Sequence, residues 1–369
     1  MLRRLACIAA SLLAITAAPA LAQTAPTSAP APAKLAPQPG DFTVKDFKFR
    51  SGETLPELRL HYMTLGQPRR DAKGHIVNAV LILHGTGGDG NQFLRPQFAD
   101  VLFAPGGLLD PARYYIILPD DIGHGKSSKP SDGLRAHFPQ YDYDDMVEAE
   151  HLLTTKGLGV DRLRLIMGTS MGCMHAFLWG EAWPEGMDAL MPLACQPMEI
   201  AGRNRAWRRM TIDAIKADPD WKGGDYTTQP QAALRTAEDL LLIAGSAPQQ
   251  MQKSYPTREK TDAWLEDAVA HGMASLDAND FMYQVASSRS YNPEPGLERI
   301  TAPVMWVNSA DDFINPPEVG MADTLAKRIK HGRYVLIPAS DRTHGHGTHT
   351  WAAVWQDLLA DLLRQSDAH

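Results

Sequence analysis

A serine between small residues offers the clearest chemistry in this sequence. The pattern G-x-S-x-G occurs as GTSMG at 168–172, between the apolar run LRLIMG at 163–168 and a helical pattern that begins at Met171. A sharp strand-to-helix turn needs small flanking residues, because the serine backbone is strained and other chain segments press close. Such a turn projects the hydroxyl outward, so Ser170 is the predicted nucleophile.

A serine hydroxyl needs a partner that takes its proton, and that partner is a histidine oriented by a carboxylate. Asp312 follows the apolar run at 304–309, and His346 follows the run at 334–340. The chain order serine, acid, histidine is the order found when the nucleophile stands on a strand-to-helix turn. Asp312 and His346 therefore complete the predicted triad.

The neighbours of these two residues leave alternatives open. Asp311 precedes Asp312, and His344 and His349 flank His346. The three histidines spell H-x-H-x-x-H, which is also a pattern for zinc ligands. Catalytic zinc needs ligands that the fold keeps oriented. In a zinc enzyme the serine at the strand-to-helix turn would also have no catalytic role. We predict no metal site.

Hydrogen-bond donors must meet the oxyanion that forms when a serine attacks a carbonyl. The backbone N–H groups of Met171 and Thr86 are the predicted donors, because Thr86 lies in the loop HGTGG at 84–88 that follows a buried strand. Further candidates for the lining of a substrate pocket are His84, Gly85, Gly87 and Arg208.

The glycine-rich loop at 84–88 does not have the pattern of a phosphate-binding loop. No G-x-x-x-x-G-K-[ST] occurs, and GKS at 125–127 fails as its end because Asp120 stands where the first glycine is required. The histidines near these loops, His84, His124 and His175, are expected to be mainly structural.

The elements around these residues predict an α/β fold. Apolar runs typical of strands buried on both faces occupy 79–85, 114–121, 163–168, 189–195, 304–309 and 334–340. Helical patterns lie between several of them, at 141–159, 171–183 and 316–332. Two segments with β-type alternation come first, at 41–49 and 57–66. Repeated strand, helix, strand predicts a mostly parallel sheet covered on both faces.

One long segment breaks this alternation. Residues 196–298 contain helix-like stretches and few strand candidates, which predicts a helical cap inserted into a core formed by 41–195 and 299–369. An insertion at the edge where ligands bind in open α/β sheets usually shapes a pocket, although a passive insertion is the alternative.

The N-terminus has the pattern of an exported protein. Residues 1–22 have a basic start, an apolar stretch and the small-residue ending Ala-Leu-Ala, which predicts a cleaved signal peptide. A membrane anchor is disfavoured because the stretch is short and contains Pro19. Residues 23–40 are rich in Pro and Ala and predict a linker. The expected location is periplasmic or secreted, without stable membrane insertion.

Composition excludes some partners. With 44% apolar and 21% charged positions, the 369 residues can bury a large core. The formal net charge is −7, and loss of Arg3 and Arg4 with the signal makes it more negative, so no nucleic-acid partner is expected. The mature chain keeps only Cys173 and Cys195, whose pairing the sequence leaves open.

With these residues in place, the sequence resembles the α/β-hydrolase superfamily, and within it the homoserine O-acetyltransferase group. The resemblance extends over about 42–363 and rests on several long segments: LHYMTLG, YDYDDMVEAEHLL, GTSMG, AIKADPDWKGGDY, LDANDFMYQ, APVMWVNSADDFINPPE and GHGTH. It implies an α/β-hydrolase fold with a helical cap. It also favours Asp312, four residues before Pro316, and His346, directly after Gly345.

The sequence departs from the group at the nucleophile turn. Transferases of this group resemble GGSMGG, whereas Thr169 and Cys173 replace glycines here, and Gly347 stands where an aspartate commonly follows the histidine. These departures weaken the case for a transferase.

A second departure concerns the amino-acid substrate. The resemblance implies an arginine that holds its carboxylate, but Ile212 occupies the aligned position, and Arg208 or Arg209 would have to substitute.

These observations predict an exported serine hydrolase that cleaves a small acyl ester through an acyl-enzyme and needs no cofactor. Acetyl-CoA, the acyl donor of a transferase, is a cytoplasmic metabolite and is not expected where an exported protein works. Water is always available there as the acyl acceptor. The rival hypothesis is a homoserine O-acetyltransferase-like enzyme, and a non-catalytic binding protein is the alternative of another class. A homodimer is compatible with the sequence.

Overall fold

The computed structural model describes residues 35–367. The predicted signal peptide at 1–22 and most of the predicted linker lie outside the described residues. The first strand, β1, spans Gln38–Lys48, so the last three residues assigned to the linker belong to the sheet. Within 35–367, no helix is long and apolar enough to cross a bilayer.

Eight strands form one sheet in the order β1-β2-β4-β3-β5-β6-β7-β8. β1 and β2 pair antiparallel, as do β2 and β4, and all other pairs are parallel. The remaining strands are β2 Thr54–Leu65, β3 Ala79–Leu83, β4 Tyr115–Pro119, β5 Leu165–Thr169, β6 Leu190–Leu193, β7 Val304–Ser309 and β8 Gly332–Ile337. The prediction of an α/β fold with a mostly parallel sheet is confirmed.

Helices cover both faces of the sheet because successive side chains of a strand point to opposite faces. In β3, Leu81 and Leu83 pack in one apolar cluster with α2 (Tyr143–Leu152) and α3 (Met171–Ala182). Val80 and Ile82 pack in the opposite cluster with α1 (Pro96–Leu102) and α10 (Gln356–Ser366). The central strands are therefore buried on both faces, as their continuous apolar runs predict.

One predicted helix is much shorter than expected. The pattern at 316–332 gives only a turn of 3-10 helix at Pro317–Val319 and the short helix α9, Ala322–Ala326. Gly320 lies between them with φ of 75°, in the left-handed region that ends helices. Edge strand β8 follows, and it is only half-buried.

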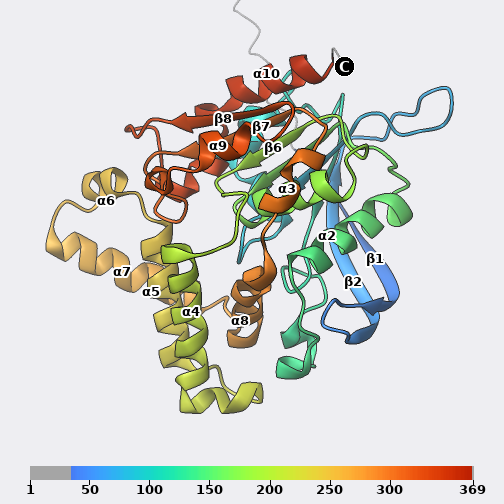
Figure 1. Cartoon of the computed structure of the whole chain (residues 1–369). Helices are drawn as coiled ribbons and strands as arrows, with labels where there is room; N and C mark the ends of the chain where they lie inside the picture. Colours follow the sequence, from blue (N-terminus) through green and yellow to red (C-terminus); the bar gives the residue numbers. More distant parts are fainter. Residues whose placement is uncertain (1–34, 368–369) are drawn as a thin grey trace, which may run out of the picture. The chain divides into compact units, whose positions relative to one another are not determined.

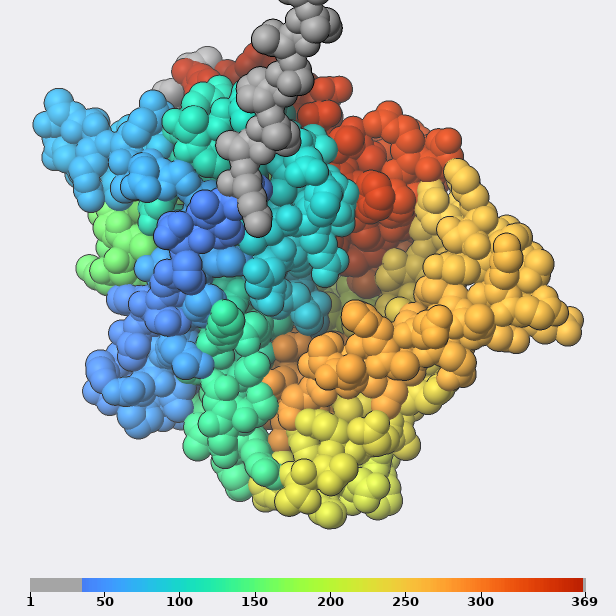
Figure 2. All heavy atoms as spheres, turned by 180° about the vertical axis from the view of Figure 1, so that it is seen from behind, coloured from blue at the N-terminus to red at the C-terminus, as the bar shows by residue number. Residues whose placement is uncertain are grey.

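Five helices between β6 and β7 form the cap. They are α4 Gly202–Ala217, α5 Gln231–Gly245, α6 Pro248–Ser254, α7 Arg258–Met273 and α8 Ala278–Ala286. They stand together beside one end of the sheet, in yellow-green to orange in Figure 1. From the opposite side, Figure 2 shows α5 to α8 as a continuous yellow-to-orange surface next to the red C-terminal part of the chain.

Candidate active site

Ser170 occupies a strained turn between β5 and α3. Its backbone has φ of 56° and ψ of −108°, a conformation that costs energy for a residue with a side chain. Gly168 and Gly172 permit the turn, because a Cβ on Gly168 would overlap the carbonyl of Gly172, and a Cβ on Gly172 would overlap that of Leu83. The turn therefore has the geometry that GTSMG predicts.

A hydrogen-bonded chain joins the serine, the histidine and the acid. The Oγ of Ser170 lies 2.8 Å from Nε2 of His346, and Nδ1 of His346 lies 2.9 Å from Oδ2 of Asp312. The backbone N–H groups of Ile314 and Asn315 donate to Oδ1 of Asp312. Burial raises the pKa of Asp312, but the charge of His346 and these hydrogen bonds outweigh it and hold the pKa below its usual value. The acid is therefore ionised where it faces the imidazole.

Asp311 has a different position from Asp312. It accepts hydrogen bonds from the hydroxyls of Ser309 and Thr343, and from the backbone N–H of Gly345 at 3.0 Å. Asp311 thus orders the loop that carries His346 and does not contact the imidazole. The structure brings Asp312, and not its neighbour, to the histidine.

The other two histidines of this segment have separate surroundings. His344 stacks on Trp351 with ring centroids 3.8 Å apart. Burial, followed by the nearby His346, lowers the pKa of His349 to about 3, so its ring is neutral. Since both ring nitrogens of His346 bond to the serine and the acid, the three rings do not converge on one point.

The predicted oxyanion donors lie at the expected places. Met171 is the first residue of α3, where an N–H has no acceptor within the helix. Gly85 packs against the nucleophile, since a Cβ added there would lie 3.2 Å from Cβ of Ser170. Thr86 follows directly, which brings the 84–88 loop beside the serine. That the N–H groups of Met171 and Thr86 bind an oxyanion stays a prediction.

His84 does not suit a role as a pocket residue, although the sequence made it a candidate. It is fully buried, its Nδ1 donates to the carbonyl of Gly85, and its Nε2 accepts the N–H of Asp121. With both nitrogens engaged by backbone, His84 supports the loop. Gly87 is exposed and lies against Phe281 of the cap, so it does face the cap.

Arg208, the other candidate, is buried in the cap at 1% exposure. Its Nε donates to Asn204 and one terminal nitrogen donates to the hydroxyl of Ser288. Within residues 35–367 it forms no ion pair with a carboxylate, whereas its neighbour Arg209 is exposed and pairs with Asp213. A buried guanidinium without an anion is costly, which suits a site that receives a negatively charged group.

The cap contacts the loops that carry the site. Gln250 of α6 donates to the carbonyl of Thr343, just before the triad histidine. Gln284 of α8 donates to the carbonyl of Gly123, and Phe281 lies beside Gly87. These contacts therefore attach the cap to three separate loops of the core.

An apolar cavity of about 200 Å³ lies between the cap and the core. It starts one turn beyond Ser170 in α3 and reaches the loop after the triad acid. Its apolar lining consists of Met174, Met198, Ile200, Ile314, Pro316 and Val319. At one end, the guanidinium of Arg203 donates to the carbonyl of Phe313. The cavity could hold an apolar group, although none of the three triad residues is part of its lining.

The two departures at the nucleophile turn have structural explanations. The hydroxyl of Thr169 accepts from Gln92 at 2.8 Å and donates to the carbonyl of Leu83. Cys173 forms a disulfide with Cys195, which links the first turn of α3 to the segment just after β6. Sequence reasoning missed Gln92, because its partner lies 77 positions away and no local pattern marks it.

We expect this disulfide to stabilise the fold measurably. It closes a loop of 22 residues, for which restriction of the unfolded chain gives about 3 kcal/mol. Urea unfolding of Cys173→Ala/Cys195→Ala should show that loss, and a reductant should lower the wild-type midpoint without changing the variant. An unchanged wild-type midpoint in reductant would mean that the bridge is not formed.

The fold and the serine turn place this chain among known proteins. Residues 78–343 match the model of the alpha/beta hydrolase fold family, so the chain belongs to that family. It is similar to a homoserine O-acetyltransferase of Geobacter sulfurreducens, with 29% identity over 86% of this chain and 96% of that protein.

Solved structures of two activities share the fold. A homoserine O-acetyltransferase from Bacillus anthracis matches with a TM-score of 0.77 at 21% identity, over 89% of this chain and 97% of that one. An acetylester hydrolase from Corynebacterium glutamicum also matches with a TM-score of 0.77, at 20% identity, over 89% and 96%. At these identities the likeness shows the fold alone.

Proposed function

We propose that this protein is a serine enzyme that takes a small acyl group onto Ser170 and passes it to an acceptor. The hydrogen-bonded chain from Ser170 through His346 to Asp312 carries this proposal. A non-catalytic binding protein would have no use for a strained serine held within 2.8 Å of an imidazole nitrogen.

In the first half-reaction, Nε2 of His346 takes the proton of Ser170 as its Oγ attacks the acyl carbonyl. Asp312 accepts the Nδ1–H of His346 and stabilises the imidazolium that forms. The N–H groups of Met171 and Thr86 receive the oxyanion. Collapse of the tetrahedral species breaks the bond to the leaving group, which takes the proton from His346. In the second half, His346 removes a proton from the acceptor as it attacks the acyl-serine, the bond from the acyl carbon to Oγ breaks, and Oγ of Ser170 regains its proton from His346.

The first candidate acceptor is a small alcohol that carries a carboxylate, as homoserine does. The name of the Geobacter relative, homoserine O-acetyltransferase, supports transfer more than hydrolysis. Arg208 supports it as well, because its buried guanidinium has no carboxylate partner within the described residues and could take that of the acceptor. The donor in this candidate is an acetyl thioester such as acetyl-CoA.

The second candidate acceptor is water. The disulfide between Cys173 and Cys195 favours it, since disulfides persist in oxidising compartments, where acetyl-CoA is not expected. The same bridge, together with the signal-like N-terminus, supports our proposal that the chain is exported to the periplasm or secreted.

Product analysis distinguishes the two acceptors. The full chain would be incubated with p-nitrophenyl acetate or acetyl-CoA, each with and without homoserine, and acetate and O-acetylhomoserine would be quantified. Acetylhomoserine as the main product supports transfer, and acetate alone supports hydrolysis. Absence of both products, and of acetyl-Ser170 in the mass spectrum, would contradict the proposed function itself.

If transfer occurs, Arg208→Gln should raise the KM for homoserine by about tenfold or more, because a charge-assisted hydrogen bond is lost. Hydrolysis of p-nitrophenyl acetate, which has no carboxylate, should change little. Arg209→Gln is the matched control on the same helix, since its side chain is exposed and pairs with Asp213. Equal effects of the two substitutions on KM would remove Arg208 from the acceptor site.

A further inference from the structure

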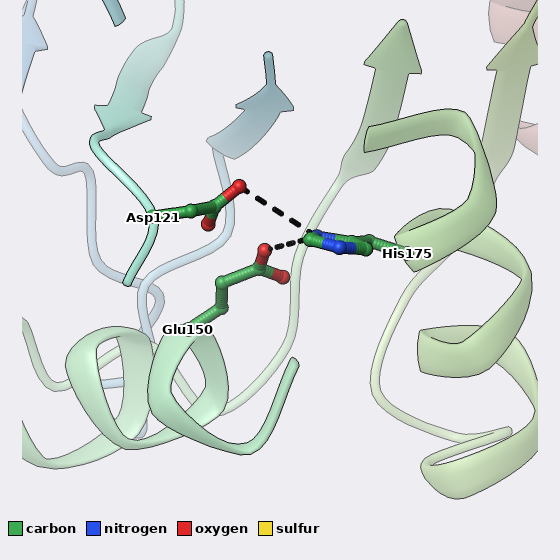
Figure 3. A group of neighbouring side chains, drawn as sticks. All are labelled: Asp121, Glu150 and His175. Atoms are coloured by element: carbon green, nitrogen blue, oxygen red, sulfur yellow. Dashed lines mark hydrogen bonds and ion pairs between the residues drawn. The ribbon is translucent and has the colours of Figure 1, made fainter. Parts of the chain in front are cut away.

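A second group of buried polar side chains lies behind the nucleophile turn. Asp121 follows β4, Glu150 belongs to α2 and His175 belongs to α3, five residues after Ser170. All three are at most 2% exposed, and one ligand atom of each lies within 4.8 Å of the others. Figure 3 shows both carboxylates pointing toward the imidazole of His175. The proposed acyl transfer does not use these residues.

Two members of the group are already oriented as ligands would be. Glu150 accepts from Trp179 through Oε2 at 2.6 Å, while its Oε1 lies 2.7 Å from Nδ1 of His175. Without a metal, Nδ1–H of His175 donates to Oε1 of Glu150, and Nε2 has no hydrogen-bond partner among the described residues. A metal on Nδ1 would displace that proton, and the neutral ring would then carry its single proton on Nε2. A partner that fixes the second oxygen of a carboxylate is typical of metal sites.

Asp121 is the unexplained member. Neither of its carboxylate oxygens accepts from an N–H or a hydroxyl group among residues 35–367, although the side chain is completely buried. The polar group within its reach is the carboxyl of Glu150. Its Oδ2 lies 3.7 Å from Nδ1 of His175 and 3.5 Å from Nε2 of His84. His84 cannot donate to it, because its Nε2 accepts the backbone N–H of Asp121 and its Nδ1 donates to Gly85.

Among residues 35–367, the basic groups that face the two carboxyl groups are the imidazoles of His84 and His175. Within the described chain, neither Asp121 nor Glu150 pairs with a lysine or an arginine. Burial, followed by repulsion from Glu150, raises the pKa of Asp121 well above its usual value. Burial also raises the pKa of Glu150, to about 7. Two carboxyl groups buried side by side with an imidazole are a set of groups that a bound cation would hold together.

We propose that Asp121, Glu150 and His175 bind one divalent transition-metal ion, of the kind that carboxylate and imidazole ligands select, such as Zn²⁺ or Mn²⁺. Metal–ligand bonds of about 2.0–2.2 Å in a tetrahedron place ligand atoms roughly 3.4 Å apart. The observed separations of 2.7 and 3.7 Å from Nδ1 of His175 bracket that value. Small rotations of the two carboxylates would therefore bring three ligands to tetrahedral positions around the ion.

Such an ion would act as a structural tie. It would join the loop after β4, helix α2 and the helix that begins at the nucleophile. Because the ion would be fully enclosed, it would not reach the acyl group. Its binding energy would instead stabilise the native state, in which alone the three ligands meet.

Metal content tests the proposal without reference to activity. The full chain, without a metal-binding tag, would be produced in medium supplemented with Zn²⁺ and Mn²⁺ and analysed by elemental mass spectrometry. We expect about one ion per chain. Anomalous diffraction at the edge of the metal found should place it between Asp121, Glu150 and His175. Refolding in a chelator should lower the melting temperature, and refolding with the ion should restore it.

Two substitutions and one control test which residues bind the metal. Asp121→Asn and Glu150→Gln preserve side-chain shape and should each lose most of the bound metal. Glu148→Gln makes the same change at an exposed position of α2 and should retain it. If a ligand variant does not fold, the wild-type anomalous map and chelator refolding still decide the question.

Several outcomes would overturn the proposal. One is folded wild-type protein that holds less than about a tenth of an equivalent after growth and refolding with both ions. Another is a melting temperature that is the same with chelator and with metal, which would point to a proton shared by the carboxyls. A third is an anomalous peak elsewhere, for instance at the histidines of 344–349.

Discussion

Ser170→Ala is expected to lower the kcat for p-nitrophenyl acetate by about 10⁶-fold, the scale seen when a catalytic serine is removed. The reason is that no other group can form the acyl-enzyme, so the remaining rate comes only from binding and from the oxyanion donors. Steady-state release of p-nitrophenol gives the rate, and mass spectrometry of the quenched enzyme shows whether an acyl group is attached.

The fold of this variant should remain intact. The substitution removes the hydrogen bond between Oγ of Ser170 and Nε2 of His346. The glycines that permit the turn are unchanged. Circular dichroism and the melting temperature provide the control. Turnover within about tenfold of wild type in a correctly folded variant would place the nucleophile elsewhere.

Asp312→Asn should lower kcat by about 10⁴-fold. An asparagine in this place can donate its N–H₂ to Nδ1 of His346, which favours the tautomer that carries its proton on Nε2. That tautomer cannot accept the proton of Ser170, so the base is lost although the geometry is kept. The measurement is the same ester assay over a range of pH.

Asp311→Asn is the matched control, because the adjacent residue undergoes the same chemical change. Its side chain bonds to Ser309, Thr343 and the N–H of Gly345 and does not touch the imidazole. Loss of one acceptor bond in this loop should cost about tenfold in kcat. If Asp311→Asn proved as damaging as Asp312→Asn, the acid would be shared or wrongly assigned.

The sequence by itself determined the sheet and the nucleophile turn. The apolar runs predicted the central strands because a strand buried on both faces needs apolar residues at every position. GTSMG predicted the turn because glycine is required where Gly168 and Gly172 meet neighbouring backbone. The absence of apolar strand runs from 196–298 predicted an inserted cap, and helices α4 to α8 lie within this segment. The strand runs and the turn each lie within a short segment, and the insertion is a continuous stretch of chain, so none of these signals depends on a tertiary contact.

Local sequence patterns gave a wrong prediction where a short segment could adopt more than one conformation. The helix expected at 316–332 is reduced to α9 and a single turn, because Gly320 adopts a left-handed conformation in its middle. His84 was expected to be mainly structural and was also a candidate for the pocket lining. Both its nitrogens bond to backbone, which fits the structural role. Hydrogen bonds of this kind cannot be inferred from the residues adjacent in the sequence.

Only the tertiary structure decided between adjacent residues of the same type. In the structure, Asp312 bonds to the imidazole of His346, and Asp311 accepts from the backbone N–H of Gly345. The two side chains differ because adjacent residues point in different directions. The tertiary structure also joins Cys173 to Cys195, and it gathers Asp121, Glu150 and His175 from three separate segments. These pairings depend on how strands and helices far apart in the sequence pack together, which no local pattern encodes.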